Sequence, residues 1–110
     1  MRILHIASEA VPWAKTGGLA DVVGALCAHF AASGHEVALA LPRYRELMAP
    51  GPHRDDPALE LDLGPGGRAH VRRSDSGTGY EVWWVDVAPL FDRPGLYGTA
   101  EGDFEDNALR

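Results

Sequence analysis

The first forty residues carry the pattern of a parallel βαβ unit, and this pattern limits the fold more than any other feature. Arg2–Ala7 is a compact, β-favouring apolar run, typical of a strand buried on both faces of a parallel sheet. A loop over Ser8–Gly18 follows, longer than most strand-to-helix connections. After a helical segment, Glu36–Leu41 is a second apolar run. Strand, helix and strand in this order predict a right-handed parallel crossover.

The helical segment is predicted from the spacing of its apolar residues. They recur every three or four positions from the end of the glycine pair onward: Leu19, Val22, Val23, Leu26 and Phe30. This periodicity predicts a helix with one core-facing side. Ser33 and Gly34 are a typical helix end, so the helix is expected to stop there.

The remainder of the chain predicts a hairpin and one more strand. A loop over Pro42–Pro57 is expected, with at most a short helix around 44–48. Leu59–Leu63 and Arg68–Arg73 flank a Gly-Pro-Gly-Gly turn and predict a β-hairpin. Tyr80–Val87 is the next strand, in which Trp83 and Trp84 point to opposite faces. The chain is irregular and acidic after Ala88, and we expect no closing strand.

These elements predict an α/β fold: an incomplete Rossmann-like domain with a mostly parallel sheet and a β-hairpin insertion. A doubly wound sheet built from two mononucleotide-binding halves needs more strands than the sequence contains. We therefore expect residues 1–110 to be part of one domain.

Charge and composition exclude several classes of function. Sixteen acidic and ten basic residues leave a net charge of -6, and the basic residues are scattered, so a nucleic-acid partner is not expected. No apolar run approaches the length of a membrane span, which argues against a membrane partner. The single cysteine, Cys27, cannot form an intramolecular disulfide, and we expect a reducing compartment, the cytoplasm.

The loop before the helix has the composition of an anion site. The first amides of a helix have no partners within it, and its dipole adds positive charge, so a phosphate can bind there. Gly17 and Gly18 permit close approach, and Lys15 adds an ammonium suited to a phosphate or a departing nucleotide. The alternative is that the glycines only make a tight turn and Lys15 is solvated. The Rossmann GxGxxG and P-loop motifs are both absent.

Three segments together resemble one family. The segments SEAVPWAKTGGLADVVGAL, VDVAPLFDRP and DNALR are similar to those of bacterial glycogen synthases and plant starch synthases. The resemblance implies a GT-B glycosyltransferase, with two Rossmann-like domains facing a cleft. It also implies transfer of glucose from ADP-glucose to the non-reducing end of an α-1,4-glucan such as glycogen, with retention. The chain would be part of the N-terminal, acceptor-side domain, without the C-terminal nucleotide-sugar domain, and inactive alone.

The same resemblance implies roles for individual residues. Lys15 would contact the phosphates of the nucleotide sugar, and the amides of Gly17 and Gly18 would approach the same region. Tyr97 resembles a position near the glucan acceptor. The histidine motif of the family and its basic residues for the pyrophosphate lie beyond Arg110 in relatives. No catalytic residue is therefore assigned to this chain, and no metal or redox cofactor is implied.

Two acidic residues flank the loop and are further candidates for substrate binding. Glu9 could line the cleft, or it could be an ordinary loop carboxylate. Asp21 could do the same, but in the first helical turn it is also well placed to interact with the helix dipole. Trp13 is a candidate for stacking on a sugar. Two other functions stay open: another GT-B glycosyltransferase, or a non-catalytic anion- or glucan-binding module.

Overall fold

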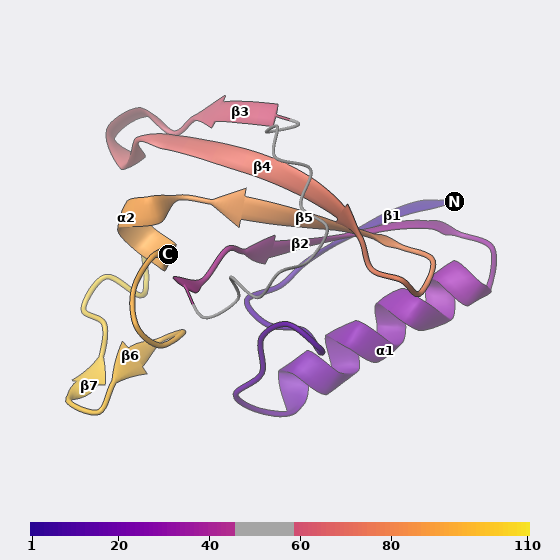
Figure 1. Ribbon diagram of the computed structural model, residues 1–110, viewed down its shortest axis with the longest axis horizontal. Helices are drawn as coiled ribbons and strands as arrows, with labels where there is room; N and C mark the ends of the chain where they lie inside the picture. Colours follow the sequence, from indigo (N-terminus) through magenta and orange to yellow (C-terminus); the bar gives the residue numbers. More distant parts are fainter. Residues whose placement is uncertain (46–58) are drawn as a thin grey trace.

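The computed structural model describes residues 1–45 and 59–110 and shows a five-stranded sheet with one long helix on one face (Figure 1). The elements in chain order are β1 (Arg2–Ile6), α1 (Gly18–Ala32), β2 (Glu36–Pro42), β3 (Leu59–Asp62), the 3-10 turn η2 (Gly64–Gly66), β4 (Arg68–Asp75), β5 (Glu81–Asp86), α2 (Ala88–Phe91), β6 (Gly98–Thr99) and β7 (Gly102–Asp103). Most of the loop predicted over Pro42–Pro57, with its short helix around 44–48, lies outside the described residues.

The sheet combines a parallel half with an antiparallel half, in the order β1-β2-β5-β4-β3. β1, β2 and β5 run parallel, with Ile3 opposite Val37 and Leu39 opposite Val82. β4 pairs antiparallel with both β5 and β3. The predicted βαβ unit and hairpin are therefore confirmed, as is the α/β class with its Rossmann-like parallel strands.

The main core lies between α1 and two neighbouring inner strands, β2 and β5. Its buried residues are Ala10, Val23, Cys27, Val37, Leu39, Leu41, Tyr80, Val82 and Trp84. The helix ends where predicted: Ala32 is its last residue, and Gly34 follows with a φ of +86°, which favours glycine. Trp84 points into this core and Trp83 to the other side of the sheet, as their adjacent positions predict.

The prediction for the buried side of α1 is confirmed for Val23 and Phe30, which lie in or against the core, but was wrong for three other residues. Leu19, Val22 and Leu26 are 50%, 56% and 40% exposed, respectively. The buried residues of the helix are Ala20, Val23, Gly24 and Cys27, and all except Val23 are small. Small residues allow the helix to approach the sheet and the preceding loop closely, so the side that carries them is the side that is buried.

The prediction that β1 is buried on both faces was also wrong. Leu4 and Ile6 are 51% and 79% exposed, whereas Ile3 packs against the core. β1 is at the edge of the sheet, and α1 covers only one of its faces (Figure 1). Within residues 1–45 and 59–110, no helix combines the length and apolar character needed to cross a membrane.

Replacing Gly24 by alanine should destabilise the chain. The new Cβ would lie 2.5 Å from Val11 Cγ2 and 3.0 Å from Val11 O. Overpacking of this kind costs about 1–3 kcal/mol, which exceeds the roughly 1 kcal/mol that alanine gains over glycine inside a helix. Urea unfolding should therefore show a net loss of stability. Gly18→Ala in the same helix is the control, because its Cβ meets nothing within 4 Å. Equal effects of the two substitutions would contradict this packing.

Candidate functional site

The loop between β1 and α1 lies at the carboxyl-terminal edge of the parallel strands, where ligands bind in open α/β sheets. A cavity of about 650 Å³ opens at this edge, and its lining includes Ser8, Tyr44 and Tyr97. A larger hollow of about 1130 Å³ lies at the opposite end, beside Arg2 and Glu36, but no candidate site residue lines it. The geometry therefore favours the carboxyl-terminal edge as the site.

Glu9 is the centre of the loop's hydrogen bonding. Its side chain is buried, with the residue only 5% exposed. Oε2 accepts hydrogen bonds from the backbone amides of Thr16 at 2.6 Å and Gly17 at 3.3 Å. Oε1 accepts from the Thr16 hydroxyl at 2.8 Å and from the Tyr97 hydroxyl at 2.9 Å. One carboxylate therefore joins three segments of the chain.

These donors keep the buried carboxylate ionised. Burial is the largest influence on the pKa of Glu9 and raises it, but the hydrogen bonds from Thr16, Tyr97 and Gly17 together outweigh burial and lower the pKa below its ordinary value. Burial also raises the pKa of Tyr97, so its hydroxyl stays protonated and can donate to Glu9.

Ser8 and Tyr44 attach the beginning of the loop to the end of β2. The Tyr44 hydroxyl donates to the Ser8 carbonyl at 2.9 Å, and burial raises the pKa of Tyr44 to about 12. The Ser8 side-chain oxygen lies 2.8 Å from the Tyr97 hydroxyl. The chain is therefore held on both sides of the Ser8–Glu9 peptide.

Lys15 and Asp21 form an ion pair on the outer side of the loop. Nζ of Lys15 lies 2.8 Å and 2.7 Å from the two carboxylate oxygens of Asp21. The two side chains are 53% and 55% exposed, respectively. Exposed pairs of this kind are worth roughly 0.2–1 kcal/mol. The Lys15 ammonium can therefore exchange its partner for another anion at low cost.

The chain itself does not require glycine at positions 17 and 18. Gly17, the N-cap of α1, has an extended backbone with a φ of -155°, and Gly18 does not have a positive φ. A Cβ built on either residue would meet nothing within 4 Å. The glycine pair therefore leaves open space in front of the helix N-terminus, whose first amides have no acceptor within the helix. The two glycines therefore do not form a tight turn that requires glycine, which was the alternative interpretation of this pair.

The structure brings the six predicted residues into two neighbouring groups. Glu9, Gly17 and Tyr97 share one hydrogen-bond network, although Tyr97 is 88 positions from Glu9. Lys15 pairs with Asp21, which lies in the first turn of α1, and Gly18 is the first residue of that helix. Whether any of them contacts a substrate stays a prediction.

Three residues of the network had no predicted role: Ser8, Thr16 and Tyr44. Thr16 lies between Lys15 and Gly17, so its position in the candidate loop was the available signal. Ser8 and Tyr44 act through long-range contacts that no local pattern reveals.

Trp13, the candidate for stacking on a sugar, is partly buried, and its contact with a sugar stays a prediction. Its ring packs edge-on against Tyr80, with centroids 6.2 Å apart, and against Trp84, with centroids 5.7 Å apart. It therefore packs against the core under the loop. Across residues 1–45 and 59–110, no three His, Cys, Asp or Glu residues come together in a way that could hold a metal ion.

Comparison with known proteins identifies the family. A family model for the starch synthase catalytic domain matches residues 2–110. The chain belongs to this family. It is 41% identical to glycogen synthase 2 of Geobacter metallireducens and 43% identical to the glycogen synthase of Paramagnetospirillum magneticum, over its whole length in both cases. The chain spans 23% of the length of each of these relatives.

A solved structure of the same family shows the same fold. The catalytic domain of starch synthase IV from Arabidopsis thaliana, bound to ADP and acarbose, superimposes with a TM-score of 0.64 and 28% sequence identity. The match covers 89% of this chain and 21% of the plant chain. The predicted resemblance to glycogen and starch synthases is thus confirmed.

The stability of the chain should depend on the ionisation of Glu9. Because its folded pKa is lowered, its charge stabilises the fold above the unfolded pKa near 4.5, and this stabilisation is lost as the pH falls below that value. At pH 7, Glu9→Gln should lower the free energy of unfolding by about 1 kcal/mol, since hydrogen bonds to a charged group are the stronger ones. Urea titrations from pH 7 to pH 3.5 should show the difference shrinking in acid. A difference that does not change with pH would contradict the ionised state of Glu9.

Proposed function

We propose that this chain forms the N-terminal, acceptor-side part of a glycogen synthase. The enzyme would transfer glucose from ADP-glucose to the non-reducing end of an α-1,4-glucan, with retention at the anomeric carbon. The family, and the ADP and acarbose bound to the plant relative, support a nucleotide-sugar donor and a glucan acceptor. Because the chain spans less than a quarter of its relatives, the activity is proposed for the full-length protein that contains it.

The open N-terminus of α1 is the observation that carries the donor assignment. The first-turn amides of Gly18, Leu19 and Ala20 have no partner within the helix. The N-cap, Gly17, makes no side-chain capping hydrogen bond, and no Cβ blocks the approach at position 17 or 18. A diphosphate can therefore come close to these amides, and the helix dipole favours its charge.

The Lys15 ammonium would complete the phosphate site. In the proposed transfer, the bond between the anomeric carbon and the phosphate oxygen breaks, and ADP leaves with the electron pair. The acceptor hydroxyl oxygen forms the new bond to the anomeric carbon, and its proton passes to the departing phosphate of ADP. A preorganised positive charge beside the departing phosphate lowers the barrier to this step. Lys15 would supply that charge, and its weak, exposed ion pair with Asp21 supports this role because the ammonium can change partners at low cost.

Lys15→Ala should strongly reduce glucosyl transfer by the full-length enzyme. Loss of one preorganised charge stabiliser typically lowers turnover by about 10²–10³-fold. Steady-state kinetics with ADP-glucose and glycogen measure the effect. The matched control is Asp21→Asn, which removes the Lys15 ion pair but keeps the ammonium. Equal losses in the two variants would mean that the surface ion pair, and not contact with the donor, explains the result.

Gly18→Ala should weaken donor binding without loss of stability. The added methyl group meets no protein atom within 4 Å, so it would occupy open space beside the helix N-terminus, where we propose that the phosphates bind. We expect the KM for ADP-glucose to rise by about tenfold or more, while the melting temperature is unchanged, as for a variant that loses binding interactions only. An unchanged KM would place the donor elsewhere.

The remaining alternatives have direct tests. A screen of sugar nucleotides with the full-length protein separates an ADP-glucose enzyme from another GT-B glycosyltransferase. Reading the coding sequence beyond Arg110 tests the proposed second domain, since a stop codon there would contradict it. Strong binding of ADP or maltooligosaccharide by the 110-residue chain alone would favour a non-catalytic binding module.

A further inference from the structure

Glu9 is the only charged residue buried within the described part of the chain. Both of its oxygens are already engaged by two donors each, all from the protein: two backbone amides on Oε2 and two hydroxyls on Oε1. A carboxylate in this position has little remaining capacity to bind a sugar or a ribose. Its contacts act on the loop itself.

The contacts fix the backbone just before the helix. Consecutive amides, those of Thr16 and Gly17, donate to one carboxylate oxygen, which sets the orientation of both peptide planes. Glu9 is close to the end of β1, where the Ala7 amide donates to the Ala40 carbonyl at 3.1 Å and so continues the parallel pairing. The carboxylate therefore ties the loop to the rigid sheet, one residue before the first amides of α1.

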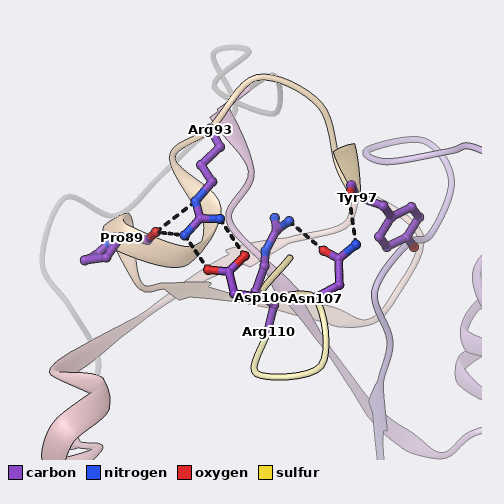
Figure 2. A network of polar contacts seen from close by, with 6 residues as sticks. All are labelled: Pro89, Arg93, Tyr97, Asp106, Asn107 and Arg110. Atoms are coloured by element: carbon purple, nitrogen blue, oxygen red, sulfur yellow. Dashed lines mark hydrogen bonds and ion pairs between the residues drawn. The ribbon is translucent and has the colours of Figure 1, made fainter. Parts of the chain in front are cut away.

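Tyr97 holds the other side of this carboxylate and is itself well anchored. Its carbonyl accepts hydrogen bonds from the Asn107 side chain at 2.7 Å and from the Phe104 amide at 2.9 Å. Arg93 binds Asp106 through two contacts of 2.7 Å and also donates to the Pro89 carbonyl. Figure 2 shows two neighbouring sets of contacts: Asn107 on the Tyr97 carbonyl, with Arg110 on Asn107, and Arg93 with Asp106 and Pro89.

We propose that Glu9 is a positioning residue for the donor site, with Tyr97 as its support: Glu9 holds the loop so that the Lys15 ammonium and the first amides of α1 face the same space. This proposal rests on the proposed function. Glu9 itself does not touch the donor, and its effect passes through the Thr16–Gly17 peptide. Substrate sites need such supporting contacts, because small displacements of binding groups lose affinity.

Glutamine at position 9 can keep the hydrogen bonds that Glu9 makes, although it carries no charge. Its side-chain oxygen can accept the two backbone amides in place of Oε2. Its NH₂ group can donate to the hydroxyls of Thr16 and Tyr97, both of which can turn to accept. Alanine offers no acceptor and leaves two amides without a partner. The two substitutions therefore separate the positioning of the loop from the charge of Glu9.

The test is calorimetric titration of the full-length protein with ADP and, separately, with maltohexaose. For Glu9→Ala we expect the Kd for ADP to rise about tenfold, which corresponds to roughly 1.4 kcal/mol, with the Kd for maltohexaose unchanged. Glu9→Gln should stay within about threefold of the wild type for ADP, because the loop contacts are kept. The control is Asp75→Ala, which removes another carboxylate-to-amide contact, to Gly77 at 2.6 Å, in the turn between β4 and β5. It should leave both Kd values unchanged.

Unchanged ADP affinity in folded Glu9→Ala, or equal losses in Glu9→Ala and Glu9→Gln, would overturn the positioning role.

If Glu9→Ala does not fold, Tyr97→Phe provides the test, because it removes one donor from Oε1 and keeps the ring. It should weaken ADP binding by about threefold; an effect on maltohexaose binding alone would overturn the role of Tyr97 as a support. Lys15→Ala separates the two proposals: if it leaves ADP affinity unchanged, the donor site itself is misplaced, whereas if it weakens ADP binding and Glu9→Ala does not, only the positioning role fails.

Discussion

The buried carboxylate of Glu9 is the interaction on which the candidate site depends. Its donors come from the loop before α1 and from Tyr97, near the other end of the chain. A buried charge without partners would cost several kcal/mol. The charge of Glu9 can therefore stay buried only while the loop and the Tyr97 segment keep their positions. The conformation of the loop thus contributes to the stability of the domain.

The candidate site has an inner side that is held by hydrogen bonds and an outer side whose side chains can change partners. The inner side is Glu9 with Thr16 and Gly17, where hydrogen bonds determine the backbone. The outer side is the exposed pair of Lys15 and Asp21, whose mutual attraction is small. In the proposed function, a phosphate would replace Asp21 as the partner of the ammonium, while the backbone amides would need no rearrangement. Such a preorganised site suits a reaction in which negative charge develops on a leaving group.

Local patterns predicted the elements well and their contacts less well. The boundaries of α1 and β2 follow from apolar spacing and from Ser33 and Gly34, because these signals are local. The buried side of α1 could not be predicted, since the helix has apolar residues on two sides and small residues decide which side packs. The Glu9–Tyr97 hydrogen bond joins positions far apart in sequence, and only the folded chain reveals it. The ring contacts of Trp13 were not predicted for the same reason, because its partners Tyr80 and Trp84 belong to a distant segment.

A crystal structure of the full-length enzyme with bound ADP tests the central claim most directly. We expect a phosphate oxygen within about 2.7–3.2 Å of the Gly18 amide and of Lys15 Nζ, the range of ordinary hydrogen bonds. Glu9 should still accept the amides of Thr16 and Gly17 and should not contact the nucleotide. Phosphates bound away from the N-terminus of α1, or a Glu9 carboxylate turned onto the nucleotide, would contradict it.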